Sequence, residues 1–189
     1  MNLLTLKGGN ALRILGESSR FSQDIDFSLA DQGELATRDR MEIQQTIFKA
    51  FLAKGFQVLN YSFLEKPKYP DNNPGNNLLG GYTITFSIIE QSSYARIPEQ
   101  NQKIASRRAY PLENQQKKIK IDISKDEYVR DRETIQYQNY LIHIYSPLMV
   151  VYEKVRASCQ QLPEYKRPKI RARDLYDIYN LLTSRNQNL

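Results

Sequence analysis

The segment from Lys118 to Ser124, KIKIDIS, is the feature that most limits what this chain can fold into. Its polar and apolar residues alternate strictly, and this period of two is typical of a half-buried strand. The three isoleucines therefore face the core, whereas Asp122 lies on the opposite face together with Lys120 and Ser124. A sheet that carries Asp122 on its polar face is therefore expected.

Hydrophobic periodicity, together with glycine and proline positions, predicts the remaining secondary structure. Strands are expected over residues 3–6, 24–29, 56–64, 82–89, 118–124 and 140–145. Helices are expected over residues 10–15, 35–54, 147–158 and 169–182. Irregular segments are expected over residues 66–81, 98–116 and 160–168. Because strands cluster early and helices late, we expect an α+β fold, with a mixed-sheet core over residues 1–145 and a C-terminal helical region over residues 146–189 packed on it.

Two aspartates, Asp24 and Asp26, lie in the segment RFSQDIDF. On a strand their side chains point to one face, while Ile25 and Phe27 point to the other. Neighbouring carboxylates repel each other unless a positive charge lies between them. Mg²⁺ prefers oxygen ligands and commonly binds one or two carboxylates together with substrate phosphates. The pair therefore predicts a metal site, although a solvated strand edge has the same pattern.

Asp122 supplies a third carboxylate if its strand lies beside the strand of Asp24. Three converging aspartates can hold two metal ions about 4 Å apart and support an in-line phosphoryl displacement. One ion would activate the attacking hydroxyl, and the other would stabilise the triphosphate and the leaving pyrophosphate. We therefore expect Asp24, Asp26 and Asp122 to be the metal ligands of a phosphoryl-transfer enzyme.

The segment KGGNALR lies upstream of these aspartates and offers groups that bind phosphate. Gly8 and Gly9 let the backbone approach a ligand closely, and the helix that follows presents free N–H groups. Asn10 can cap this helix or donate to a phosphate. Lys7 and Arg13 add positive charge. Two glycines alone also form ordinary turns, so the prediction depends on the order of Gly-Gly, short helix, D-x-D and a later strand with a third aspartate.

The chain of 189 residues carries a net charge of +6, which fits an anionic partner such as RNA or nucleotide phosphates. A basic region is either a solvated loop or a contact to the RNA backbone; it consists of Arg107, Arg108, Lys117 and Lys118. No apolar run approaches the roughly 20 residues of a membrane span, and the N-terminal residues do not form a secretory signal. The single cysteine excludes an intrachain disulfide framework. These features predict a cytoplasmic protein without membrane association.

The order of the motifs is that of polymerase-beta-like nucleotidyltransferases. The chain resembles the AbiEii/AbiGii-type nucleotidyltransferase toxins of bacterial abortive-infection and type IV toxin–antitoxin systems. The matching segments are LKGGNALRIL, RFSQDIDFSL, IKIDIS, YSPLMVVYEKVRAS and RARDLYDIYNLL. The resemblance implies a polymerase-beta-like core, transfer of a nucleotide from an NTP to an acceptor, and a cognate antitoxin as partner. The tRNA 3′ end is an acceptor for some relatives.

The resemblance also assigns roles to residues by motif. The implied nucleotide-binding residues are Lys7, Gly8, Gly9, Asn10, Arg13, Ser22 and Lys154. The implied catalytic residues are Asp24, Asp26, Asp122, Lys154 and Asp174, with Arg173 and Asp177 in the same late R-D-x-x-D motif. Asn10 stands where many relatives have serine or threonine, so a hydroxyl that contacts phosphate is replaced by an amide.

Without the resemblance, the residue pattern does not decide the roles of Lys154 and of the R-D-x-x-D motif. Arg173 and Asp177 are four apart on the expected helix and can pair, whereas Asp174 faces elsewhere. This motif either buttresses the helix against the sheet or takes part in catalysis. Lys154 lies among valines, where a surface lysine that lays its stem along apolar neighbours is an alternative to a nucleotide contact.

The leading hypothesis from the sequence is a Mg²⁺-dependent nucleotidyltransferase toxin that acts on RNA, at the tRNA 3′ end. A first alternative is a nucleotidyltransferase that modifies a protein or a small molecule, because fold does not determine the acceptor. A second alternative is an inactive RNA-binding or regulatory relative. The presence of all three aspartates favours an active enzyme.

Overall fold

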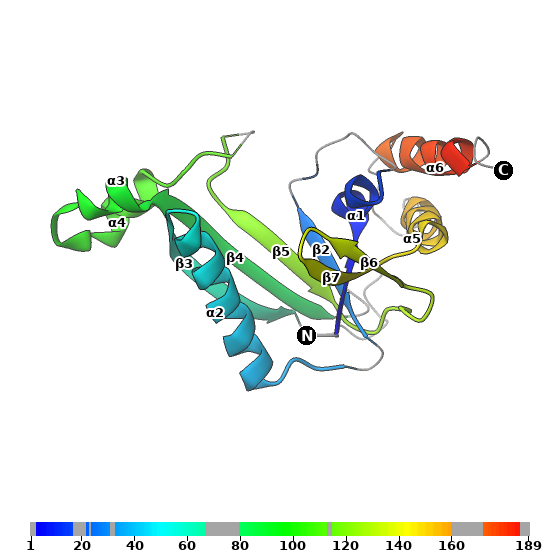
Figure 1. Cartoon of the computed structure of the whole chain (residues 1–189), viewed down its shortest axis with the longest axis horizontal. Helices are drawn as coiled ribbons and strands as arrows, with labels where there is room; N and C mark the ends of the chain where they lie inside the picture. The colour runs from blue at the N-terminus through cyan, green and yellow to red at the C-terminus, as the bar shows by residue number, and fades with distance from the viewer. Residues whose placement is uncertain are drawn as a thin grey trace. The chain divides into compact units, whose positions relative to one another are not determined.

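The computed structural model describes residues 3–16, 22, 24–30, 33–66, 80–112, 115–159 and 172–185. The chain divides into two compact units, each described below by itself (Figure 1). The first comprises Met1–Gly33, Lys66–Gly81 and Asp122–Leu189, and the second comprises Glu34–Glu65 and Tyr82–Ile121. None of the helices within the described ranges is long and apolar enough to cross a bilayer.

A short interior strand organises the first unit. Strand β1 (Leu4–Lys7) pairs antiparallel with β2 (Ile25–Leu29) and parallel with β7 (Tyr140–Ile144). The register places Lys7 opposite Asp26. Strand β7 also forms an antiparallel hairpin with β6 (Glu133–Tyr137). The last residue of β1 and the second residue of β2 are therefore neighbours at one end of the pair.

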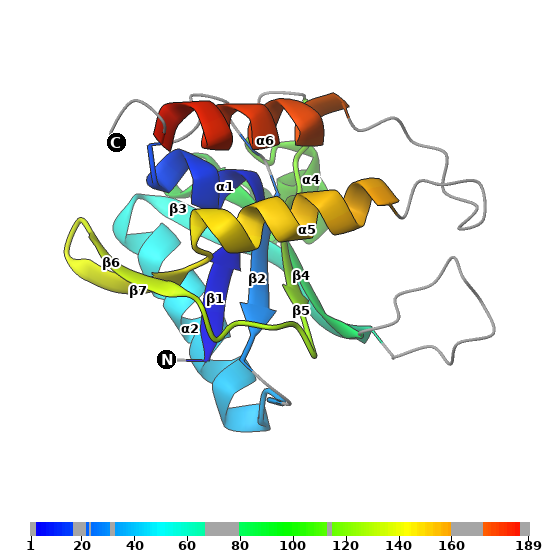
Figure 2. The same ribbon diagram turned by 90° about the vertical axis from the view of Figure 1, so that its right-hand side faces the viewer.

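Three helices belong to the same unit. They are α1 (Gly8–Ile14), α5 (Pro147–Cys159) and α6 (Ala172–Arg185), which lie together in Figure 2. One buried apolar cluster joins all three of them, and it contains Leu12, Val129, Tyr145, Met149, Val150 and Leu181. A second cluster of Leu6, Ala11 and Ile144 packs α1 against β1 and β7. The start of α1 is thus fixed by packing directly behind β1.

The second unit contains a long amphipathic helix and an aromatic core. Its elements are α2 (Thr37–Ala53), β3 (Phe56–Lys66, which ends in the first unit), β4 (Gly81–Glu90, which begins there), α3 (Gln91–Ala95), η1 (Pro98–Gln100) and α4 (Gln102–Arg107). The rings of Phe51 and Phe86 meet edge to face at 5.3 Å. The guanidinium of Arg40 lies 4.8 Å from the ring centre of Tyr82, a distance typical of a cation–π contact.

Strand β5 (Ile119–Ser124) contributes residues to both units, because the division falls between Ile121 and Asp122. The seven strands of the described residues follow the hydrogen-bonded order β3-β4-β5-β2-β1-β7-β6. The part of the chain that the structure describes has six α-helices and a sheet with parallel and antiparallel pairs, which is the predicted mixed α+β architecture. The proposed boundary at residue 145 stays a prediction.

Most predicted elements are confirmed, with three corrections. The strand of the first aspartate pair begins at Ile25, so Asp24 precedes it. The segment 98–116 is not wholly irregular, because η1 and α4 lie within it. Strand β6 and helix α3 were not predicted. The loop expected over 66–81 and the linker expected over 160–168 fall largely outside the described residues, as does the predicted start of the last helix at residue 169.

Candidate active site

Gly8 and Asp26 are in close contact at the end of the β1–β2 pair. Gly8 has a φ of +70°, a left-handed conformation that side chains other than glycine rarely adopt. A Cβ at this position would lie 2.8 Å from Oδ2 of Asp26. Glycine is therefore required both by the backbone conformation and by the carboxylate beside it. Gly8 and Gly9 are the first residues of α1, and we call them the glycine turn. Gly8 is thus a direct neighbour of Asp26.

The carboxylate of Asp26 lies in an environment that disfavours its charge. Burial raises the pKa of Asp26 to about 6, and the nearby carboxylates of Glu153, Asp122 and Asp24 raise it further, against the lowering effect of Lys7. The three aspartates predicted from the sequence thus share one electrostatic environment. This environment has more negative charge than its own lysine offsets, as expected for a site that receives a cation.

Asp24 and Asp122 differ in their surroundings. Asp24 is exposed, and its backbone carbonyl accepts a hydrogen bond of 2.7 Å from the side-chain amide of Asn10. Ser22 also donates to this carbonyl, at 3.5 Å. Asp122 forms an ion pair of 2.6 Å with Lys66. Within the described ranges, no group of three or more side chains is already arranged at metal-ligating distances.

Lys7 is held in a buried network beneath the glycine turn. Its ammonium lies 2.5 Å from Glu127, 3.3 Å from Glu153 and 3.1 Å from the hydroxyl of Ser124. Burial alone would lower the pKa of Lys7, but the attraction of Glu153 and Glu127 outweighs it, so that the pKa is raised. Lys7, predicted to bind nucleotide, therefore has an ammonium that is directed to side chains of the protein.

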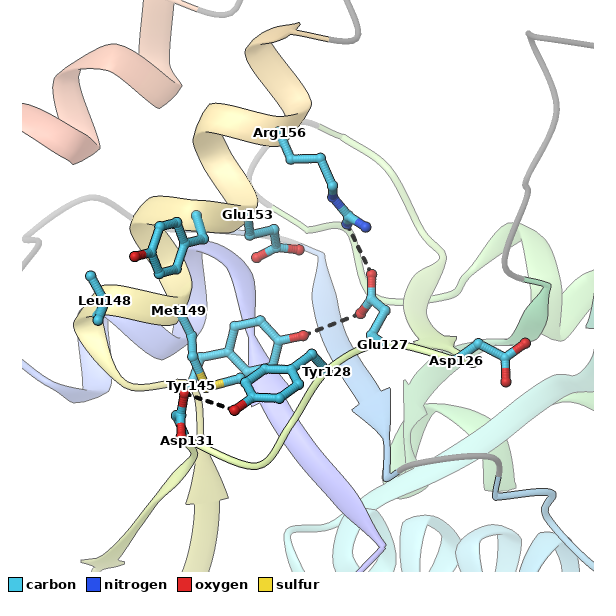
Figure 3. Close-up of a pocket in the computed structure, with 10 residues that line it drawn as sticks. Asp126, Glu127, Tyr128, Asp131, Tyr145, Leu148, Met149, Glu153 and Arg156 are labelled. Atoms are coloured by element: carbon cyan, nitrogen blue, oxygen red, sulfur yellow. Dashed lines mark hydrogen bonds and ion pairs between the residues drawn. The ribbon is translucent and has the colours of Figure 1, made fainter.

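Glu127 is the main acceptor of this network (Figure 3). It accepts from the hydroxyl of Ser28, from Arg156 at 3.1 Å and from the Tyr145 hydroxyl at 3.3 Å. Burial raises the pKa of Glu127, but the charge of Lys7 and these hydrogen bonds outweigh it and hold the pKa below its usual value. We call Lys7, Ser28, Ser124, Glu127, Tyr145, Glu153 and Arg156 the Lys7 network. Apart from Lys7, sequence reasoning did not identify its members.

Lys154 joins helices α5 and α6 from inside the protein. Its side chain is 9% exposed, and its ammonium lies 2.7 Å from Asp177 and 3.1 Å from Asp174. The alternative of a surface lysine with a solvated head is therefore wrong. The expectation that Asp174 faces away is wrong as well, because both aspartates point to the same lysine. Arg173 is exposed.

A pocket of about 260 Å³ lies against the Lys7 network (Figure 3). Its lining combines carboxylates and aromatic rings, and includes Glu127, Tyr128, Asp131, Tyr145, Tyr152 and Glu153. We call it the tyrosine pocket. Glu127 and Glu153 line this pocket and also pair with Lys7, the residue directly before Gly8.

A family model described as the nucleotidyl transferase AbiEii toxin of type IV toxin–antitoxin systems matches residues 1–189. The chain belongs to the AbiEii family. Two solved structures from Helicobacter pylori are similar to it, and no curated protein matches. JHP933 is 16% identical with a TM-score of 0.46, and 95% of this chain aligns with 58% of that protein. A candidate nucleotidyltransferase is 15% identical with a TM-score of 0.44, and 93% of this chain aligns with 58% of it. The chain thus spans less than two thirds of either protein.

The AbiEii motifs of the first unit form two groups. The glycine turn and Asp26 are in contact, and Asp24 and Asp122 influence the same carboxylate. Lys154 and Asp174 form a separate buried ion pair between α5 and α6. Arg13 is exposed on α1. The basic residues Arg107, Arg108, Lys117 and Lys118 are all exposed on the second unit.

The missed residues gave little signal in the sequence. Ser28, Glu127 and Tyr145 come from distant segments, and no periodicity relates them. Glu153 is the exception, because it immediately precedes Lys154 in a segment that matches the family. Among the predicted residues, Asn10 has a structural contact in addition to its expected role, since it ties α1 to the segment before β2.

Proposed function

We propose that this AbiEii protein is a Mg²⁺-dependent nucleotidyltransferase that transfers a nucleotide from an NTP to an RNA acceptor, the 3′ end of tRNA. The observation that carries this proposal is the contact between Gly8 and Asp26. It brings a turn able to admit phosphates against a carboxylate whose pKa is raised by burial and, to a lesser extent, by neighbouring carboxylates. Nucleotidyl transfer needs these two features together, because metal and phosphates must meet in one place.

Asp24, Asp26 and Asp122 fit a divalent cation by chemistry and by charge. All three offer the hard oxygen ligands that Mg²⁺ prefers. The raised pKa of Asp26 supports this proposal, because a positive charge beside a buried carboxylate favours its ionised form. When bound there, Mg²⁺ would lower the pKa of the attacking hydroxyl and offset charge on the phosphates. Asp122 would exchange its pairing with Lys66 for the cation.

The glycine turn and the Lys7 network would position the phosphates. Backbone N–H groups near Gly8 and Gly9 can approach a phosphate closely, because no side chains cover them. Lys7 lies directly before this turn and is buried against Glu127. It would therefore hold the turn in place and contribute its charge from beneath the site. Loss of this support would displace the phosphates relative to Asp26.

Lys154 and Asp174 would act together as a unit that joins the two late helices. In the proposal the ammonium of Lys154 stabilises charge on the nucleotide, and Asp174 and Asp177 keep that ammonium ionised and oriented. The basic residues of the second unit, with the net charge of +6, would bind the RNA backbone. The proposal includes a cognate antitoxin as a partner, as the family description implies.

The direct test incubates the protein with each labelled NTP and total RNA, in the presence of Mg²⁺ or of EDTA. We expect one or more NTPs to label RNA of tRNA size, and we expect EDTA to abolish labelling. Asp26→Asn should abolish transfer while leaving the protein folded. Asp39→Asn is the matched control, because this carboxylate accepts a 2.9 Å bond from the backbone of Ala36 and an amide oxygen can replace it.

The outcome separates the proposal from its alternatives. Near-parental labelling by folded Asp26→Asn protein would overturn the assignment of the metal site. Label that appears on protein or on a small molecule would show that the acceptor is not RNA. RNA binding without any transfer, by a protein that is folded and pure, would identify an inactive relative. RNA affinity should fall by orders of magnitude between low and moderate salt, since phosphate contacts release counterions.

A further inference from the structure

The tyrosine pocket has a lining that does not suit a phosphate. Carboxylates of Glu127, Asp131 and Glu153 face it, and Arg156 is its cation. That arginine is already bonded to Glu127 at 3.1 Å. An anionic group entering this space would meet repulsion from several carboxylates. The pocket therefore selects a neutral or cationic group that can donate hydrogen bonds.

The pocket also offers flat apolar surfaces. Tyr128 and Tyr152 both line the pocket and are 57% and 66% exposed, so their rings are accessible to a ligand. The hydroxyl of Tyr128 donates to Asp131 at 3.0 Å, so its ring is fixed in orientation (Figure 3). Leu148, one helical turn before Tyr152 on α5, is exposed as well. Ordered aromatic faces of this kind bind planar rings by stacking.

The volume of the pocket and its position beside Lys7 further limit which ligands fit it. At about 260 Å³ the pocket is smaller than the roughly 300–1,000 Å³ of sites that enclose a drug-sized ligand, so it suits one ring system rather than a whole nucleotide. Glu153 lines it, lies 3.3 Å from Lys7, and influences the carboxylate of Asp26. A ring held here would thus lie beside the proposed phosphate turn.

We propose that the tyrosine pocket binds a nucleobase that carries an exocyclic amino group, stacked against Tyr128 and Tyr152 with Glu153 as the acceptor of its N–H. This inference rests on the proposed function and adds base selectivity to it. Carboxylates accept from the exocyclic amino groups of cytosine, adenine and guanine, whereas uracil has no amino group and carries a carbonyl where cytosine has one. The base belongs either to the incoming NTP or to the last nucleotide of the RNA acceptor.

The first experiment measures equilibrium binding of the α,β-methylene analogues of ATP, CTP, GTP and UTP by calorimetry. If the base is that of the NTP, at least one amino-bearing analogue should bind at least about tenfold more tightly than the uridine analogue. Tyr152→Ala should weaken that binding about tenfold, and Tyr152→Phe should keep it, because stacking needs the ring and not the hydroxyl. Tyr128→Ala and Tyr128→Phe form a second matched pair.

The second experiment distinguishes the acceptor as the source of the base. Transfer to a short RNA that ends in A or C is compared with transfer to the same RNA ending in U. If the pocket holds the acceptor base, Tyr152→Ala should raise KM for RNA about tenfold and leave NTP affinity unchanged. Glu153→Gln should narrow the preference for an amino-bearing base in whichever arm shows it, since an amide can donate to the carbonyl of uracil.

Each failure has a distinct meaning. If the parent protein transfers nucleotide and both tyrosine-to-alanine variants keep parental NTP affinity and RNA KM, the nucleobase assignment is overturned and the proposed function stands. If the parent binds neither NTP analogues nor RNA, both fall. If arginine amide binds the pocket saturably and nucleotides do not, the pocket binds a basic side chain, and the nucleobase assignment is wrong.

Discussion

Replacement of Lys154 by methionine should strongly destabilise this protein, although the sequence alone would allow a surface lysine there. Methionine keeps much of the unbranched stem and removes only the charge. The ammonium lies within 3.1 Å of two carboxylates, and the side chain of Asp177 is fully buried. Lys154→Met would remove the ammonium from beside that carboxylate, in a site that water does not reach.

The size of the effect follows from burial. Removal of one partner from a buried ion pair costs about 3–5 kcal/mol in the free energy of unfolding. In a chain of this length 1 kcal/mol corresponds to about 2–4 °C, so the melting temperature should fall by about 6–20 °C. A solvated lysine would change stability by less than about 0.5 kcal/mol. Lys49→Met, at an exposed position on α2, is the control for that outcome.

The assay is thermal and urea unfolding followed by circular dichroism, with a double-mutant cycle. Asp177→Asn removes the carboxylate charge that Lys154 offsets, so the double variant Lys154→Met/Asp177→Asn should lose about 1–3 kcal/mol less than the sum of the single losses. NTP transfer is measured well below the lower melting temperature, where Lys154→Met should retain little activity. If Lys154→Met melts within about 2 °C of the parent, the reasoning from burial is refuted.

Two further predictions concern the glycine turn and Asp26. Gly8→Ala should abolish most transfer and lower the melting temperature more than the control Gly16→Ala. Both positions have a positive φ, but only a Cβ at Gly8 meets the carboxylate of Asp26. Equal losses of melting temperature and transfer in the two variants would show that this contact is unimportant. Folding raises the pKa of Asp26 from 3.8 to about 6, so the parent protein in EDTA should lose stability as pH rises between about 4 and 6. Asp26→Asn should be the more stable protein above about pH 6, and the difference between the two should vanish below about pH 4. Unfolding curves across this pH range check the sign, and a parent more stable than the variant at pH 7 would contradict it.

Local patterns were sufficient for most of the fold. The alternation of KIKIDIS identified β5, and glycines with a short apolar period identified α1. The start of α4 was also readable, because the side chain of Asn101 accepts from the backbone of Lys103 and Ile104 as an N-cap. That capping signal was overlooked within a segment whose charge suggested a loop. Strand β6 was not predicted because its alternation of polar and apolar residues is weak. Its extended conformation depends on pairing with β7, which local sequence does not reveal.

The site was less accessible to sequence reasoning. Asp24, Asp26 and Asp122 could be proposed because a D-x-D pair and a strand aspartate are visible locally. The acceptor beneath the turn could not, since Glu127 lies 120 positions from Lys7 along the chain. The role of Lys154 was ambiguous for the same reason. Whether a helical lysine is solvated or buried depends on the partner helix, and here α6 supplies both carboxylates.

The place of β1 inside the sheet has a consequence for how the site is lost. Its backbone is bonded to β2 on one side and to β7 on the other, and its last three residues are buried. Amide protons on such a strand exchange with solvent only when a large cooperative part of the protein opens. Gly8 follows Lys7 directly, so the turn cannot detach while β1 remains in place. Hydrogen exchange at β1 should therefore report the opening event that separates Gly8 from Asp26.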